Sequence, residues 1–159
     1  MKLTRGLQRQ RLSASRKVKP PAWFLLLVVL GLAWNLAGVA SFLSDMMMSE
    51  ARLAAMPEAQ RALYLSTPTW AWIAYGVAVF SGSLGCLALL LRRNFAVPLL
   101  LLSLLAVLLQ MFHAWFVARA AATQSLSDLL LPALVIGVAV GLLVLAVQAR
   151  NQVWTGRAP

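Results

Sequence analysis

Acidic and titratable side chains are scarce in this chain. Of its 159 residues only four are Asp or Glu, one is His and one is Cys. A lone cysteine cannot form an internal disulfide, so Cys86 is interpreted as a small packing residue. The usual catalytic signatures are missing as well: CxxC, HExxH, GxSxG, a phosphate-binding loop and paired carboxylates in an apolar run. We therefore expect no enzymatic activity, no metal and no cofactor.

Charge is also missing from four long stretches. Residues 22–43, 69–91, 95–117 and 129–147 contain no Asp, Glu, Lys or Arg. About 20 apolar residues in a helix cross a hydrocarbon core of about 30 Å, so each stretch is long enough to span a membrane. The connections are short. The pattern predicts an all-α integral membrane protein, an antiparallel bundle of four transmembrane helices within residues 22–148, with an arm at 1–21 and a tail at 149–159.

The charges that remain are sorted by sign. Residues 1–21, the turn Arg92-Arg93-Asn94 and the tail carry 11 of the 14 basic residues and no acid. The other two connections carry all four acids and three basic residues. Basic residues mark the cytoplasmic side, so both termini are predicted to be cytoplasmic in a multi-pass membrane protein.

The basic arm has several interpretations. A net charge of +10 is compatible with nucleic-acid binding. Seven of the basic residues, however, lie within the first 19 positions, directly before a span, where they suit anionic lipid headgroups. A cleaved signal peptide is the other alternative, but the first apolar run exceeds the 7–15 residues of a signal core. An uncleaved anchor, a lipid bilayer partner and no nucleic-acid partner are therefore expected.

The one sizeable outer connection is predicted to be partly helical. Residues 49–65 are rich in Ala, Glu, Arg, Met and Leu, and Pro57 suits the first position of a helical turn. This segment is expected to form a short amphipathic helix on the outer side. Ser66-Thr67-Pro68 reads as the start of the second span, and Ser125 with Asp128 as a capping box before the fourth.

Small residues recur every four positions in three spans. Such stripes let helix backbones approach closely, either inside the monomer, which we favour, or between copies. The first span contributes Ala33, Ala37 and Ser41, the second Ala74, Ala78 and Gly82, and the fourth Ala133, Gly137 and Gly141.

Polar residues inside the apolar runs are the candidate site. At 1.5 Å per residue, Asn35 lies about 20 Å up the first span, Gln110 about 22 Å up the third, and Tyr75 about 9 Å below the outer start of the second. These positions predict one polar layer in the outer half, with Trp34 and His113 close by. The layer either binds helices to one another, which we favour, or lines a ligand pocket. Methionines on the outer side could bind Cu(I), but they lack the Met-x-x-Met spacing, and no metal site is predicted.

Several motifs carry a resemblance. They are Trp34-Asn35 with Gly38, Met56-Pro57-Glu58 and Tyr64, Pro68-Thr69-Trp70, the run 78–85 (AVFSGSLG), Leu90-Leu91-Arg92-Arg93, Ala96-Val97-Pro98 and Ser103-Leu104. Over residues 22–148 the chain resembles a group of small bacterial four-span inner-membrane proteins without an assigned activity, some of them labelled as sugar transporters. The resemblance implies the same four-helix fold, a place in the bacterial inner membrane and, through that label, substrate transport.

Two functions are consistent with these patterns. The first, which we favour, is a non-enzymatic accessory or interaction subunit that meets another copy of itself or another membrane protein. The alternative is an oligomeric carrier or channel for a small solute, with the polar layer lining its path. The two differ in whether Asn35, Tyr75 and Gln110 face a cavity or only pack.

Overall fold

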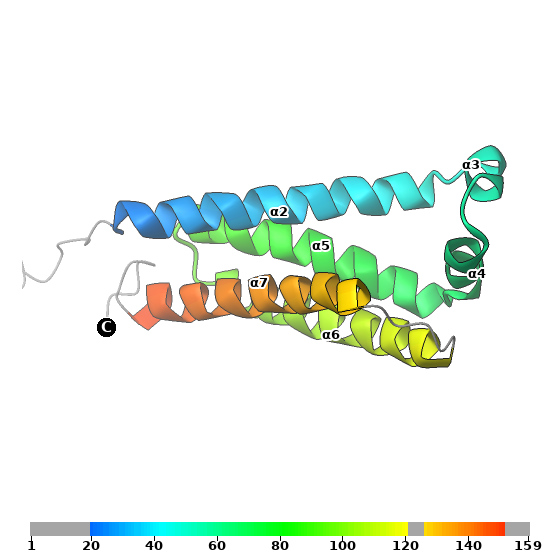
Figure 1. The fold of residues 1–159 in the computed structure, drawn as a ribbon. Coiled ribbons are helices and arrows are strands. Elements are labelled where there is room, and N and C mark those ends of the chain that lie inside the picture. Colours follow the sequence, from blue (N-terminus) through cyan, green and yellow to red (C-terminus); the bar gives the residue numbers. More distant parts are fainter. Residues whose placement is uncertain (1–19, 121–125, 152–159) are drawn as a thin grey trace, which may run out of the picture.

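The computed structural model describes residues 20–120 and 126–151, which form helices joined by short turns (Figure 1). These helices are α2 (Ala22–Met46), α3 (Glu50–Ala54), α4 (Glu58–Ser66), α5 (Thr69–Leu90), α6 (Ala96–Ala120) and α7 (Leu126–Asn151). No strand occurs in these residues. The basic arm, most of the tail and Ser125 of the expected capping box lie outside the described residues.

The predicted fold class is confirmed. Among the described residues, α2, α5, α6 and α7 are long and apolar enough to cross a membrane. The chain is therefore a multi-pass membrane protein. Its helices run past the uncharged stretches, α2 to Met46 and α7 from Leu126 to Asn151. A helix satisfies its own backbone hydrogen bonds, so it has no reason to stop where the apolar residues do.

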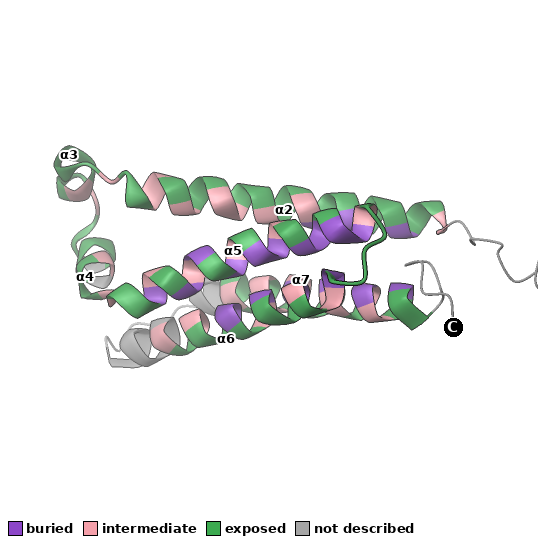
Figure 2. Cartoon of the chain, turned by 180° about the vertical axis from the view of Figure 1, so that it is seen from behind, coloured by how far each residue is buried: buried purple, intermediate pink, exposed green. Residues whose placement is uncertain are grey.

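Helix α5 is the centre of the bundle. It packs against α2 on one side and α6 on the other, and α7 packs mainly against α6. Figure 2 shows α5 with more buried positions than its neighbours, whereas α2 is mostly exposed. The first residues of α2, the turn between α5 and α6 and the last residues of α7 lie at one end, here called the hairpin end (Figure 1). Helices α3 and α4 lie at the other end.

The main apolar core sits at the hairpin end. There all four long helices meet in one buried cluster, whose largest members are Phe24, Val28, Leu89, Leu100 and Leu142. A smaller cluster of Ala78, Ala106 and Val107 lies farther toward α3 and α4. The bundle is thus closely packed at the hairpin end and less so in its other half.

Small residues bring α5 close to α6. Gly85 is buried, and a Cβ atom there would stand 2.6 Å from Cγ of Leu100 and 3.4 Å from its backbone nitrogen. Neighbouring buried positions on α5 are also small: Ala74, Ala78, Ser81 and Gly82. This is the close approach that the stripe on the second span predicts.

The outer connection forms two short helices instead of one. Ser49 caps α3 by accepting a hydrogen bond from the Arg52 backbone N–H at 3.3 Å, and Pro57 directly precedes α4. Proline has no N–H to donate and so separates the two helices. The Tyr64 hydroxyl then donates to the Asp45 carbonyl at 2.8 Å, which ties α4 to the end of α2.

The turn after α5 ends that helix with a left-handed residue. Arg92 has φ 55°, the Arg93 N–H donates to the Ala88 carbonyl at 2.8 Å, and the Arg92 N–H donates to the Leu89 carbonyl at 3.0 Å. These two bonds form a Schellman motif, in which glycine usually holds the left-handed position. The turn reverses the chain into α6, as its length predicts.

Two glycine substitutions test the packing of α5. Gly85→Ala should lower the free energy of unfolding by about 1–3 kcal/mol, because the new methyl group overlaps Leu100. Gly137→Ala is the matched control, since a Cβ there meets no atom within 4 Å. It should stabilise the helix by about 0.5–1 kcal/mol. Reversible unfolding of both variants in mixed micelles measures the difference, and equal effects would contradict this packing.

Candidate functional site

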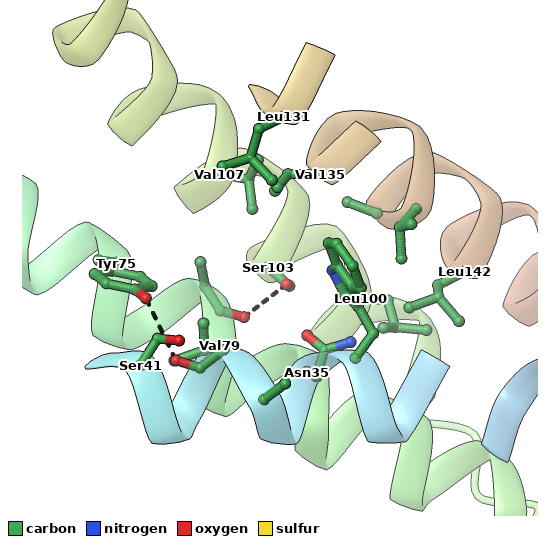
Figure 3. Close-up of a pocket in the computed structure, with 16 residues that line it drawn as sticks. Asn35, Ser41, Tyr75, Val79, Leu100, Ser103, Val107, Leu131, Val135 and Leu142 are labelled. Carbon is green, nitrogen blue, oxygen red and sulfur yellow. Dashed lines mark hydrogen bonds between the residues drawn. The ribbon is translucent and has the colours of Figure 1, made fainter. Parts of the chain in front are cut away.

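A cavity of about 280 Å³ lies between the four long helices (Figure 3). Its walls are mostly aliphatic and aromatic, with a few hydroxyl and amide groups. The lining residues are Trp34, Asn35, Ala37, Gly38 and Ser41 from α2; Tyr75, Ala78 and Val79 from α5; Leu100, Ser103 and Val107 from α6; and Leu131, Val135, Val138, Ala139 and Leu142 from α7. Every one of these residues falls inside an uncharged stretch of the sequence.

The cavity is accessible from the side and narrow at the hairpin end. Lining residues of α2 and α7 are exposed along one edge, among them Trp34, Ala37 and Leu131. Toward the hairpin end, α2 and α7 meet where Gly31 faces Leu142, so closely that a Cβ at position 31 would overlap that side chain. A molecule would therefore reach the cavity laterally, between α2 and α7.

Asn35 lies where α2 crosses α5. Its Nδ2 donates to the Gly31 carbonyl at 2.8 Å and contacts Cys86 Sγ at 3.9 Å. Its Oδ1 stands against Gly82, in the space that a Cβ at that position would need. The amide thus bonds to the backbone of its own helix and packs against a glycine of α5.

Ser103 is the polar contact between α5 and α6. It is buried, and its Oγ donates to the Ala78 carbonyl at 2.7 Å. A Cβ at position 82 would stand 2.9 Å from the same Oγ. Gly82 therefore makes room for a polar side chain on each side, Asn35 from α2 and Ser103 from α6.

Tyr75 forms the opposite end of the cavity. Its hydroxyl donates to the Gly38 carbonyl at 3.4 Å and also meets the Ser41 hydroxyl (Figure 3). Its ring packs edge-on against Phe42 with 5.3 Å between ring centroids. Since Gly82 faces Asn35 and lies seven residues from Tyr75, the two polar groups are about 10 Å apart along the bundle.

The structure brings together only part of the expected polar layer. Trp34, Asn35 and Tyr75 line the cavity, whereas Gln110 and His113 do not. Gln110 lies one turn beyond Val107, the last lining residue of α6. His113 packs edge-on against Trp70 of α5, 5.3 Å between centroids. The expected single layer is therefore divided, since Asn35 lies about 10 Å nearer the hairpin end than Tyr75.

Ser103 and Ser41 are site residues that the polar-layer argument passed over. Ser103 is a polar residue within a leucine-rich run, the same signal that singles out Asn35. Ser41 belongs to the small-residue stripe of the first span and contributes its hydroxyl beside Tyr75. The contribution of α7 to the lining carries no signal in the sequence, since its lining residues are all aliphatic.

The small-residue stripes divide between the inside and the outside of the bundle. Ala74, Ala78 and Gly82 are buried in the helix contacts of α5. Ala133, Gly137 and Gly141 are exposed, and a Cβ at either glycine would meet no atom within 4 Å. The second-span stripe therefore serves packing within the monomer, whereas the fourth-span stripe lies on the surface of the described bundle.

The polar groups of the site are bonded to the helix backbones. Asn35, Tyr75 and Ser103 donate their hydrogen bonds to backbone carbonyls. Within residues 20–120 and 126–151, no group of three or more His, Cys, Asp or Glu side chains could hold a metal ion.

Comparison of the chain with known protein families, curated sequences and solved structures finds no match.

Removal of the Ser103 hydroxyl tests its bond between helices. Ser103→Ala should lower the free energy of unfolding by about 0.6–1.7 kcal/mol, since it deletes the bond from α6 to α5. Ser81→Ala is the matched control, because that buried hydroxyl donates to Val77 of its own helix at 2.5 Å. The control should change stability little. An equal loss in both, measured by unfolding in micelles, would show that the bond to Ala78 adds nothing.

Proposed function

We propose that this membrane protein is a non-enzymatic accessory subunit that binds another membrane-spanning helix through the exposed face of α7. The observation that carries the proposal is the stripe formed by Ala133, Gly137 and Gly141. These residues lie four apart on one face, are exposed, and have no neighbours where their glycines would carry a side chain. A second helix can approach the α7 backbone there more closely than at any leucine-covered surface.

The surroundings of the stripe favour a helix over a lipid as its partner. Exposed positions next to it are large and apolar, such as Leu134, Val140 and Val144. Small residues flanked by large ones form a shallow groove, into which the ridge of a second helix fits. The partner is another copy of this chain, paired through the same face by a two-fold axis, or a different membrane protein.

The carrier alternative has less support. Its path needs Asn35, Tyr75 and Gln110 in one water-accessible cavity, but Gln110 lies outside the lining. The two that do line it donate to helix backbone carbonyls. Contact between Gly31 and Leu142 also narrows the cavity at the hairpin end, where a path across the membrane would have to continue.

The double substitution Gly137→Leu with Gly141→Leu tests the α7 face. The variant should fold as the unsubstituted chain does, because both positions are empty of neighbours. It should lose its partner, because leucine fills the groove. Native mass spectrometry after gentle extraction measures this, and distinguishes a homodimer from a foreign subunit by mass.

Ala40→Leu is the control for added bulk on a lipid-facing surface. Ala40 is exposed on α2 and does not line the cavity. This variant should keep the partner of the unsubstituted protein. If the double α7 variant keeps its partner as well, or if the unsubstituted protein is monomeric at native expression levels, the proposal fails.

We further propose that the hairpin end and both termini face the cytoplasm of a bacterium, with the chain in the inner membrane. The basic residues of the arm, the turn Arg92-Arg93-Asn94 and the tail support this orientation. The resemblance to bacterial four-span proteins points to the same membrane.

Cysteine labelling measures the orientation. The single native thiol, Cys86, is buried and should stay unlabelled. Ala54→Cys and Asn94→Cys place exposed thiols at the two ends of the bundle. In intact spheroplasts, an impermeant maleimide should label position 54 and leave position 94 unlabelled until the membrane is lysed. The reverse pattern would invert the orientation.

A further inference from the structure

We propose that the cavity between the four helices binds one acyl chain of a bilayer lipid, which enters from the side between α2 and α7. The inference does not depend on the accessory role. The lining of α7 includes Ala139 and Leu142, whereas Gly137 and Gly141 lie on a different face of that helix. A partner on one face and a lipid on the other are compatible.

The depth of the cavity places it in hydrocarbon. Its lining on α2 begins at Trp34, about 18 Å from the start of that helix, and ends at Ser41, about 28 Å from it. In a hydrocarbon core of about 30 Å, the α2 lining therefore lies in the half of the membrane nearer α3 and α4. Leu100 and Leu142 extend the lining toward the hairpin end. The exposed edge at Trp34, Ala37 and Leu131 therefore faces lipid chains, not water.

The size of the cavity suits a chain segment. A volume of about 280 Å³ is nearly twice that of an engineered apolar cavity of about 150 Å³ that binds benzene. Residues 131–142 line it over about 16 Å of α7, so the cavity is elongated along the helices. An extended hydrocarbon segment fills such a shape better than a compact solute does.

The chemistry of the walls also favours hydrocarbon. Valine, leucine and alanine form most of the lining, and three polar groups on it already donate to backbone carbonyls: Asn35, Tyr75 and Ser103. A polar solute would have to give up its water for walls that offer it few free partners. An acyl chain has no polar groups along its length, so it loses no hydrogen bonds when it leaves the surrounding lipid.

The end of the cavity nearer α3 and α4 is polar enough to suit the ester end of such a chain. The Ser41 hydroxyl is exposed and stands beside Tyr75 at about the depth where lipid chains meet their glycerol esters. At the hairpin end, the contact between Gly31 and Leu142 limits how far the chain tip can reach. The lipid would thus come from the leaflet on the side of α3 and α4.

Photolabelling in vesicles tests the proposal. The full chain is reconstituted in vesicles of palmitoyl-oleoyl phosphatidylcholine that contain a minor fraction of a phosphatidylcholine with a diazirine in one acyl chain. After irradiation, labelled residues are identified by mass spectrometry. Lining residues of α2 and α7 should be labelled more strongly than lipid-facing Leu30, and their labelling should saturate as the probe fraction rises.

Two variants that fill the cavity from opposite walls decide the matter. Ala37→Phe and Val135→Phe should each remove the saturable labelling of the lining and leave that of Leu30 unchanged. Ala40→Phe, exposed on α2 outside the lining, should keep both. The unfolding midpoint of each variant shows whether it folds. If one of the two cavity-filling variants does not fold, the other one tests the proposal.

Two outcomes would overturn the proposal. The first is labelling of the lining that rises linearly with probe and persists in both filled variants, since that is ordinary contact with bulk lipid. The second is an unlabelled lining in a dimer that Ala37→Phe separates into monomers. A second copy of the chain would then cover the cavity.

Discussion

The close approach of α5 to its two neighbours is the contact on which the bundle depends. Gly85 lets Leu100 of α6 lie against the α5 backbone, and Gly82 does the same for Asn35 and Ser103. In a membrane, lipid tails are as apolar as the side chains, so helices gain little from burying leucine against leucine. They gain from close contact and from hydrogen bonds between helices, and both need small residues on the shared face.

The same contact explains why the cavity exists where it does. Asn35, Tyr75 and Ser103 are held by backbone carbonyls close to small residues, so the helix walls on either side are fixed. Helix α7 packs mainly against α6 and meets α2 at the hairpin end, where Leu142 lies against Gly31. The bundle is therefore closed at the hairpin end and leaves space between α2 and α7 in its other half. One face of α7 lines this space, and a different face carries Gly137 and Gly141.

Much of the fold was predictable from the sequence because it follows from local composition. Uncharged runs predicted the four spans, Pro68 predicted the start of α5, and the turn at Arg92 predicted the hairpin. Two candidate site residues, Asn35 and Tyr75, were found as polar groups in apolar runs. Their difference in depth along the bundle was not predicted, because a depth counted in residues along each helix ignores helix tilt and the points where helices cross. Gln110 was expected in the same layer, and it lies one turn beyond Val107, the last lining residue of α6.

What the sequence could not provide was rotation of helices about their own axes. Stripes on the second and fourth spans look alike as strings of small residues, yet one is buried and the other exposed. Which face of a helix turns inward depends on the side chains of its neighbours, which a single stripe does not contain. The aliphatic lining of the cavity on α7 could not be predicted for the same reason.

Arg92 has a consequence for how the membrane protein is made. It holds a left-handed conformation that costs a non-glycine residue roughly 1–2 kcal/mol, at a position where glycine is the usual choice. The α5–α6 hairpin thus gives up local stability for a second positive charge at its tip. In the proposed orientation that charge resists translocation during insertion, so the residue contributes to biogenesis at the expense of the finished fold.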